Sequence, residues 1–323
     1  MVIITGANGF IGSAMVWELN QNNIPVSSVV DLVSREQRPQ LLQNKSFQKF
    51  LQKDELWDEL NLPETITKTT WVIHLGANSS TTETDANLLW EMNTHYTQRI
   101  FEWCAKHKKN LIYASSAATY GDGSLGYDDF TDSEQLKPLN LYGESKVRFD
   151  RWALKQTETP PHWYGLKFFN VYGPNEYHKG SMASVVYKSF HQIKSGQDLK
   201  LFKSYLPAYA DGEQKRDFVY VKDVTRWMRE LMDKKPKSGL YNMGFGEART
   251  WKDLGLGVYK AMNKDAKIQF IDMPENIRDQ YQYYTKANMQ TWLNNGMSKP
   301  MWSLEAGIED YVHNHLQHND KIL

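Results

Sequence analysis

Short apolar runs alternate with longer amphipathic stretches along the first half of the chain. Three of these runs are Val2–Thr5, Val26–Val30 and Trp71–Leu75, and two more follow at Leu111–Ala114 and Gly165–Phe169. Runs of this length and composition are typical of strands that are buried on both faces of a parallel sheet. Strands that alternate with helices predict an α/β fold, here a doubly wound parallel sheet of the Rossmann type.

The helical stretches divide the chain into two parts. Amphipathic helices are predicted at 13–23, 83–106 and 140–157, and shorter ones at 181–194, 221–233, 250–262 and 303–317. Strands after residue 170 are less regular, and no clean linker separates the parts. We expect a dinucleotide-binding domain over 1–170 and a smaller mixed α/β domain over 171–323 that is mainly substrate-binding, with some segments returning to the first domain. A substrate cleft is expected between them.

Composition and charge narrow the functional classes. The chain has 323 residues, of which 41% are hydrophobic and 24% charged, as expected of a folded globular protein. Lys plus Arg and Asp plus Glu both number 38, which gives no electrostatic case for nucleic acid or an anionic membrane as a partner. The lone cysteine, Cys104, fits a reducing compartment and is expected in a buried helix. With neither a signal peptide nor a membrane-length apolar run in the sequence, a cytoplasmic location is expected.

A glycine-rich turn directly follows the first predicted strand. Gly6, Gly9 and Gly12 lie between that strand and the first predicted helix, which is the context of a dinucleotide-binding fingerprint. These glycines would allow a tight turn, a close approach of the backbone to a pyrophosphate, and close packing of helix on strand. The second strand leads to Asp31, roughly 20 residues beyond Gly12, as expected of an acid that binds the adenosine ribose.

Tyr142 and Lys146 are four residues apart in a predicted helix, so both lie on one face of it. The lysine charge is expected to lower the pKa of Tyr142 from its ordinary value near ~10, which suits proton transfer. Ser116 follows the strand at Leu111–Ala114 and would hydrogen-bond a reacting hydroxyl. Together with the glycine turn, these residues resemble the Ser–Tyr–Lys arrangement of the short-chain dehydrogenases, in which Lys146 would also hold the nicotinamide ribose.

The glycine spacing G-x-x-G-x-x-G resembles that of the extended short-chain dehydrogenase/reductase family. Nearly the whole chain resembles the ADP-L-glycero-D-manno-heptose 6-epimerases of bacterial lipopolysaccharide synthesis, through the blocks YASSAATYG (113–121), KPLNLYGESK (137–146), FFNVYGP (168–174), HKGSMASV (178–185) and KRDFVYVKDV (215–224). The HKGSMAS block is the most discriminating, because generic nucleotide-sugar epimerases share the first half of the pattern but not this segment.

The resemblance implies an isomerase that inverts C6″ of ADP-D-glycero-β-D-manno-heptose by transient oxidation and re-reduction with bound NADP. Two faces of the oxidised carbon need two proton-transfer groups, and Tyr142 and Lys179 match those roles. Without the family, Lys179 would be taken for an ordinary surface lysine. Known members of the family are pentamers, so a homopentamer is also implied.

The resemblance assigns further residues to the cofactor and to the substrate. The cofactor set is Gly6, Gly9, Phe10, Ile11, Gly12, Asp31, Leu32, Arg38, Lys53, Leu75, Gly76, Ala77, Asn78, Ser79, Asn93, Lys146 and Val171. The substrate set is Ser116, Asn170, Ser181, Lys188, Phe202, Arg216 and Tyr281. Arg216 suits a diphosphate because a guanidinium can bind two oxygens at once. No metal site is expected, because the histidines within 313–318 lack converging cysteine or carboxylate ligands.

Two signals on the cofactor conflict. Asp31 favours NAD because a carboxylate repels a 2′-phosphate. Arg38 and Lys53, however, fall where family members place basic residues near that phosphate. NADP is the prediction, and NAD stays open.

Several positions depart from the family pattern. Leu75 replaces a usual glutamate, Leu32 an asparagine, and Lys188 a histidine that contacts substrate. The segment Ser204–Gln214 is longer than the family's loop before Arg216, so an altered substrate is an alternative.

Two other functions remain alternatives. One is a different nucleotide-sugar epimerase, such as a 4-epimerase that shares the tyrosine–lysine chemistry. The other is a dinucleotide-sensing protein without turnover, although such proteins tend to lose the tyrosine or the lysine. Dehydration is disfavoured, because Ala117 and Ala118 stand where dehydratases carry an acid pair.

Overall fold

A parallel sheet of seven strands forms the centre of the protein in a computed structural model that describes residues 1–278 and 281–323. Its strands are β1 (Val2–Thr5), β2 (Val26–Asp31), β3 (Lys49–Gln52), β4 (Trp71–His74), β5 (Asn110–Ser116), β6 (Trp163–Phe168) and β10 (Gly239–Met243). They lie in the order β10-β6-β5-β4-β1-β2-β3, and all six neighbouring pairs are parallel. The order reverses at β1, which is the switch point of a doubly wound sheet. The predicted fold is therefore confirmed.

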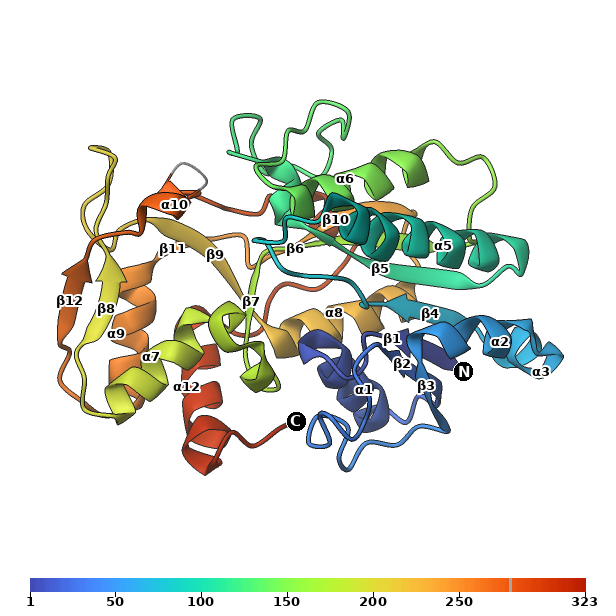
Figure 1. Cartoon of the computed structure of the whole chain (residues 1–323), viewed down its shortest axis with the longest axis horizontal. Helices are drawn as coiled ribbons and strands as arrows, with labels where there is room; N and C mark the ends of the chain where they lie inside the picture. The colour runs from blue at the N-terminus through green and yellow to red at the C-terminus, as the bar shows by residue number, and fades with distance from the viewer. Residues whose placement is uncertain (279–280) are drawn as a thin grey trace.

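Helices cover both faces of this sheet (Figure 1). One face carries α1 (Phe10–Gln21) and α8 (Val221–Lys234), and the other carries α5 (Tyr96–Lys106) and α6 (Leu141–Leu154). Successive side chains of a strand point to opposite faces, and accordingly Ile4 joins the apolar core on the α1 side while Ile3 joins the core on the α5 side. Cys104 is fully buried in the second core, as predicted.

Most helices of the first part follow the predicted ranges closely. The helix expected at 83–106 begins at Ala86, because the carboxylate of Asp85 accepts a hydrogen bond from the Leu88 N–H and caps the helix there. It runs as α4 (Ala86–Leu89), a π-helical turn η2 (Trp90–His95) and α5. The turns between the strands add η1 (Lys53–Glu55), α2 (Leu56–Asn61), α3 (Pro63–Lys68) and η3 (Ala117–Tyr120).

The part after residue 170 builds a second, mixed layer. Three strands, β7 (Asn170–Tyr172), β9 (Lys215–Tyr220) and β11 (Ala248–Thr250), form one small sheet, and β8 (Leu199–Phe202) pairs with β12 (Ile268–Ile271). Around them pack η4 (Tyr177–Met182), α7 (Val185–Lys194), α9 (Trp251–Ala261), α10 (Glu275–Arg278), α11 (Gln290–Asn294), α12 (Leu304–Asn314) and η5 (Leu316–His318). A separate apolar core lies between α7, α9 and α12.

Some of the later chain returns to the large sheet. Strand β10 pairs with β6, and Trp227 of α8 and Trp292 of α11 are buried in the core that also holds Met15 of α1. Figure 1 shows α8 lying beside α1.

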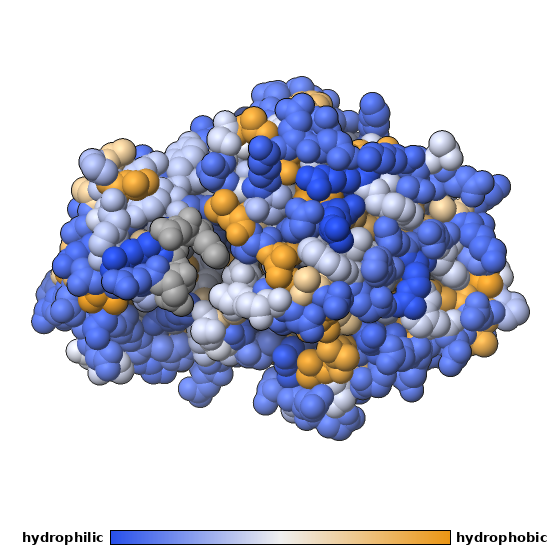
Figure 2. All heavy atoms as spheres, turned by 45° about the horizontal axis from the view of Figure 1, so that its top comes forward, coloured by the Kyte–Doolittle hydropathy of each residue, from blue (hydrophilic) through white to orange (hydrophobic). Residues whose placement is uncertain are grey.

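The surface in Figure 2 is mostly hydrophilic, and its hydrophobic residues stand in small separate groups. Large exposed apolar side chains include Phe130 and Met301, from distant parts of the sequence. Within residues 1–278 and 281–323, no helix combines the length and apolar character needed to cross a membrane.

Candidate functional site

A cavity of about 950 Å³ opens at the carboxyl ends of β1, β4, β5 and β6. The later part of the chain closes its other side through η4 and through Phe218, Trp251 and Thr285. Of the residues predicted from the sequence, it is lined by Gly6, Gly9, Phe10, Ile11, Gly12, Asp31, Leu32, Arg38, Lys53, Leu75, Gly76, Ala77, Asn78, Ser79, Ser116, Tyr142, Lys146, Asn170, Val171 and Lys179. The structure thus brings residues that are more than 170 positions apart in the sequence to the expected edge of the sheet.

The glycine turn can exist only with glycine at its tightest points. Gly6 has a φ of +68°, and a Cβ placed on Gly12 would lie 2.0 Å from the carbonyl oxygen of Gly6. Helix α1 begins with Gly9 as its N-cap, and no side chain caps its first N–H groups. These groups face the cavity at the positive end of the helix dipole, which is where a pyrophosphate binds in dinucleotide folds. The cradle therefore fits the diphosphate of a nicotinamide dinucleotide.

The end of β2 supplies both signs of charge to the cavity. The carboxylate of Asp31 accepts hydrogen bonds from the backbone N–H groups of Asn8 (2.8 Å) and Val33 (2.9 Å), and burial raises its pKa. Arg38 donates to the carbonyl oxygen of Asn8 at 3.2 Å. Lys53 reaches the same cavity, where its ammonium lies 5.5 Å from the centre of the Tyr96 ring. Arg38, Lys53 and the Asp31 carboxylate thus lie around the region predicted for the adenosine ribose, and the Lys53 ammonium also pairs with the exposed Asp54 carboxylate at 3.0 Å.

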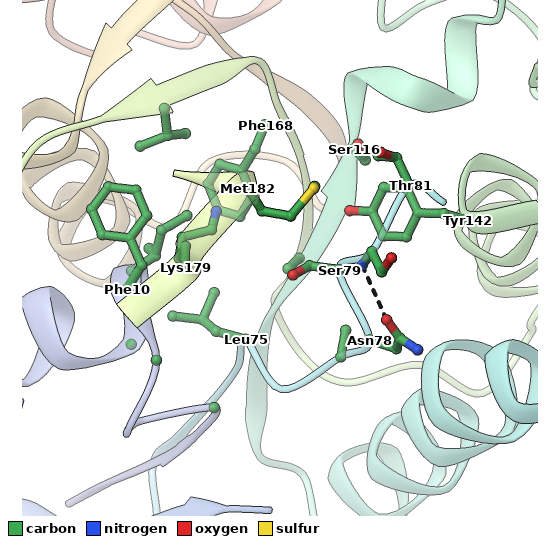
Figure 3. A pocket seen from close by; sticks show the side chains of 18 of the residues that line it. Phe10, Leu75, Asn78, Ser79, Thr81, Ser116, Tyr142, Phe168, Lys179 and Met182 are labelled. Carbon is green, nitrogen blue, oxygen red and sulfur yellow. Dashed lines mark hydrogen bonds between the residues drawn. The ribbon is translucent and has the colours of Figure 1, made fainter. Parts of the chain in front are cut away.

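Tyr142 is placed by the first turn of α6. Asn140 precedes this helix, and its side-chain oxygen accepts from the Gly143 N–H at 2.8 Å, which fixes where the helix starts. The phenol then projects into the cavity beside Ser116, which comes from the end of β5 (Figure 3). Lys146, one turn further along α6, donates to the carbonyl oxygen of Ala114 at 2.9 Å. Serine, tyrosine and lysine therefore converge as the sequence predicted.

The electrostatics of this group differ from the prediction. Burial raises the pKa of Tyr142, and only the hydrogen bond with Ser116 opposes that rise. The ammonium of Lys146 lies 6.0 Å from the centre of the Tyr142 ring and is engaged by Ala114. Burial also lowers the pKa of Lys146 to about 8, with the Asp150 carboxylate opposing. The predicted lowering of the Tyr142 pKa by Lys146 is thus wrong for this structure, because desolvation outweighs the more distant charge.

Lys179 enters the cavity from the side opposite to Tyr142 (Figure 3). It belongs to η4, which is kinked at Gly180 where φ is +52°. Its ammonium lies 5.5 Å from the centre of the Phe10 ring, and burial lowers its pKa although the Glu176 carboxylate opposes this. A lysine with a lowered pKa can exchange a proton nearer to neutral pH than a solvated one can. The family resemblance, and not the local sequence, singled out this residue.

Asn93 lies behind the cavity wall and is not among the residues that line it. Its side-chain oxygen accepts from the Asn78 N–H at 2.8 Å, and its amide donates to the Asn78 carbonyl at 2.9 Å and to the Ser145 hydroxyl at 2.9 Å. Asn93 therefore holds the loop after β4 against α6, and it would act on the cofactor through Asn78.

The predicted substrate residues Phe202, Arg216 and Tyr281 form a cluster next to the cavity. The guanidinium of Arg216 lies 5.0 Å from the Tyr281 ring centre and 5.7 Å from that of Trp251, a residue that lines the cavity. The indole of Trp251 donates to the Tyr281 hydroxyl at 2.8 Å, and the Phe202 and Tyr281 rings are 6.5 Å apart. The cluster thus places a cation and two aromatic rings behind Trp251, which is its member that lines the cavity.

Ser181 and Lys188 lie outside the cavity lining. The ammonium of Lys188 donates to the carbonyl oxygen of Ser181 at 2.7 Å, so the two predicted substrate residues are joined to one another. Their neighbours Met182, Ala183 and Ser184 do line the cavity.

The long loop before Arg216 packs against the later segment that carries Arg278 and Tyr283. The Tyr209 and Tyr283 rings are 5.5 Å apart, and the Tyr205 N–H donates to the Tyr283 hydroxyl at 3.1 Å. The Arg278 guanidinium lies 4.1 Å from the centre of the Tyr205 ring. The loop thus covers the side of the cluster that carries Tyr281.

Several lining residues were not predicted from the sequence, among them Thr81, Phe168, His178, Met182 and Trp251. His178 adjoins Lys179 in the HKGSMAS block, so the block itself could have indicated it. Its Nδ1 is buried without a hydrogen-bond partner among the described residues, and burial lowers the pKa of His178 to about 4. In the described part of the chain, no group of three or more His, Cys, Asp or Glu side chains is placed to hold a metal ion.

Comparisons with known proteins identify the family of the chain. Residues 2–244 match the model of the NAD dependent epimerase/dehydratase family. The ADP-L-glycero-D-manno-heptose-6-epimerase of Fusobacterium nucleatum subsp. nucleatum is 45% identical over the full length of both chains, and that of Nitratidesulfovibrio vulgaris is 44% identical, also over 100% of each. The crystal structure of the Helicobacter pylori ADP-L-glycero-D-manno-heptose-6-epimerase, 27% identical, superposes with a TM-score of 0.77 over 97% of this chain and 95% of that one. The chain therefore belongs to the NAD dependent epimerase/dehydratase family, and within it to the ADP-L-glycero-D-manno-heptose-6-epimerases.

Proposed function

We propose that this epimerase inverts the configuration at C6″ of ADP-D-glycero-β-D-manno-heptose and yields the L-glycero epimer. The observation that carries the proposal is the placement of Tyr142 and Lys179 on opposite sides of one cavity (Figure 3). A carbon that loses a hydride from one face and regains it on the other needs a proton-transfer group on each side. The names of the full-length relatives supply the substrate.

The residues divide the proton chemistry as follows. A nicotinamide dinucleotide, when bound, supplies the hydride acceptor and donor. One of Tyr142 and Lys179 takes the proton from the C6″ hydroxyl as the hydride leaves, so that carbon and oxygen are left as a ketone. After the ketone has rotated, the hydride returns to the opposite face of C6″ while the other residue gives a proton to the oxygen, so that no net oxidation results. Ser116 would hydrogen-bond the reacting oxygen, since it lies beside the Tyr142 phenol.

The proposal extends to the cofactor-binding residues. Gly6, Gly9 and Gly12 would cradle the pyrophosphate, with Phe10 and Ile11 beside it. Lys146 would hold the nicotinamide ribose, and the other cofactor contacts would come from Leu32, Leu75, Gly76, Ala77, Asn78, Ser79 and Val171, all of which line the cavity. Because these contacts come from both parts of the chain, the cofactor would help hold the two parts together.

We infer a preference for NADP over NAD. Both oxygens of the Asp31 carboxylate accept backbone N–H groups, which holds this side chain against the backbone of Asn8 and Val33. Arg38 and Lys53 line the same end of the cavity and can neutralise that phosphate. Comparing the affinities for NADPH and NADH tests this inference, and an Arg38→Ala variant should lose affinity for NADPH selectively.

The substrate would lie with its heptose between Tyr142 and Lys179 and its ADP towards Arg216. Phe202, Tyr281 and Trp251 offer rings on which an adenine can stack, and the buried guanidinium of Arg216 suits the diphosphate. Asn170 lines the cavity between the two ends, and the Ser181–Lys188 pair borders η4. The finer expectations of lipopolysaccharide inner-core synthesis and a homopentamer rest on the family resemblance, and that of a cytoplasmic setting rests on the sequence alone.

An NMR assay of the purified protein tests the proposal. ADP-D-glycero-β-D-manno-heptose should convert to an equilibrium mixture of both epimers without net change in the oxidation state of added NADP. In deuterated water the C6″ hydrogen should be retained, and full incorporation of deuterium there would rule out direct hydride return. UDP-glucose, the corresponding probe for a 4-epimerase, should remain unchanged.

A further inference from the structure

We propose that the segment Asn319–Leu323 is a positioning element for Lys179, a role that rests on the proposed function of Lys179 in proton transfer. Figure 1 shows the chain leaving α12 and running back to the domain that holds α1. The 3₁₀ helix η4, which carries Lys179, lies between α12 and α1 (Figure 1). The segment therefore has the reach to fix that turn relative to the cofactor-binding domain.

The first line of support is a chain of hydrogen bonds through Asn175. This residue is fully buried and has a φ of +81°, a strained value that neighbouring contacts must hold. Its amide nitrogen donates to the Ser13 hydroxyl of α1 at 2.9 Å, and its amide oxygen accepts from the Leu323 N–H at 2.9 Å. Asn175 thus joins the segment to the helix that follows the glycine turn.

A second contact reaches the 3₁₀ helix that carries Lys179. The hydroxyl of Tyr177 donates to the main-chain oxygen of Lys321 at 2.8 Å, and His315 Nδ1 lies 2.7 Å from the same oxygen. The Tyr187 hydroxyl of α7 donates to the Asp320 carboxylate at 3.1 Å. The segment therefore contacts η4 through Lys321 and α7 through Asp320.

The far end of the segment is anchored in the cofactor domain. The Lys45 ammonium donates to the main-chain oxygen of Leu323 at 2.6 Å. The Leu323 side chain packs against the small apolar core formed by Phe10, Ala14 and Val221. Phe10 is also the residue whose ring lies 5.5 Å from the Lys179 ammonium. Phe10, at the start of α1, thus contacts both the segment and the proposed proton-transfer lysine.

The turn that carries Lys179 is also closed by hydrogen bonds within itself. Its folding can therefore be distinguished from its exact position relative to α1. The buried Glu176 carboxylate accepts from the Gly173 N–H at 3.2 Å and from the Ser184 N–H and hydroxyl, both at 2.6 Å. These bonds close the loop 173–184 without help from the segment. Removing the segment should therefore leave the loop formed but free to shift relative to α1. A displacement of a reacting group by about 1 Å can cost on the order of 10²-fold in rate.

The test compares Tyr177→Phe and a chain that ends at His318 with Lys179→Met. Two controls are matched to the first variant. Tyr164→Phe removes an equivalent phenol-to-carbonyl bond, to Pro236 at 2.9 Å, far from the turn. Lys321→Ala removes only an exposed side chain. It keeps the main-chain oxygen of residue 321, which accepts the hydrogen bond from Tyr177.

Single-turnover hydride transfer, followed as reduced nicotinamide absorbance, is measured with each epimer separately. Lys179→Met should lose transfer from one epimer and keep it from the other, which depends on Tyr142. The two segment variants should reproduce that selectivity, with a loss of about tenfold for Tyr177→Phe and more for the shortened chain. The controls should match the unmodified protein. An equal loss with both epimers would mean that the segment only stabilises the fold and would overturn the proposal.

Hydrogen exchange of the backbone amides in 175–184 gives a readout that needs no substrate. It should quicken several-fold in both segment variants and stay unchanged in both controls. Unchanged exchange in the segment variants would refute the positioning role. If the unmodified protein transfers no hydride from either epimer, the proposed function fails, and the exchange measurement still decides the role of the segment.

Discussion

The buried ion pair between Asp150 and Lys167 should be the most sensitive point of the sheet to a single charge deletion. Asp150 lies in α6 and is fully buried, and it accepts from Ser115 (2.7 Å), Tyr113 (3.0 Å) and the Lys167 ammonium (3.2 Å). Lys167→Met leaves that carboxylate with two hydroxyl donors and without its hydrogen-bonded cation, so that only the Coulombic interaction with Lys146 remains. Removing one partner of a buried pair costs about 3–5 kcal/mol of unfolding free energy, because the remaining charge stays desolvated.

The assay is the thermal midpoint of each variant at one scan rate. At roughly 2 °C per kcal/mol for a chain of this size, Lys167→Met should lower the midpoint by roughly 6–10 °C. Adding Asp150→Asn should recover much of that loss, because the pair is then neutral. Lys155→Met is the matched control: its pair with Glu134 at 2.6 Å is exposed, so its removal should cost less than ~1 kcal/mol. A double variant no more stable than Lys167→Met alone would refute the reasoning.

Three further predictions concern the cavity. Tyr142→Phe and Lys179→Met should each reduce epimerisation by about 10²–10⁴-fold in the NMR assay, as loss of a general acid–base does, with cofactor affinity retained. Burial lowers the pKa of Lys146 to about 8, so it is charged below that pH, and NADPH affinity measured by fluorescence should fall as pH rises through about 8. Gly12→Ala should abolish NADPH binding, because its Cβ would lie 2.0 Å from the Gly6 oxygen.

Local patterns were sufficient for much of the fold and of the cofactor cradle. The glycine turn was predictable because its requirement is steric and lies within seven residues of sequence, from Gly6 to Gly12. Strand β3 was not predicted, since Lys49–Gln52 is a half-exposed edge strand without a continuous apolar run. Strand β10 lies some 70 residues beyond its partner β6, and only tertiary packing pairs them.

The pKa values and surroundings of the charged groups in the site could not be predicted from the sequence. The spacing of Tyr142 and Lys146 correctly predicted a shared helix face, but it could not predict how deeply the phenol is buried. Burial decides the direction of the Tyr142 pKa, and burial depends on the whole cavity. Lys179 gave no local signal, because the Phe10 ring that faces its ammonium comes from a distant part of the sequence. Family resemblance located it, and the structure accounts for its environment.

An inversion at a side-chain carbon places an unusual demand on this architecture. Tyr142 is held by the large sheet through α6, whereas Lys179 belongs to the later part of the chain. Relative motion of the two parts would change the distance between these two proposed proton-transfer groups and so slow hydride transfer from one epimer more than from the other. The contacts of Asn175 with Ser13 and with Leu323 cross that boundary and oppose such motion. If the proposed roles of Tyr142 and Lys179 hold, efficient hydride transfer from both epimers depends on contacts outside the cavity as well as on the residues that line it.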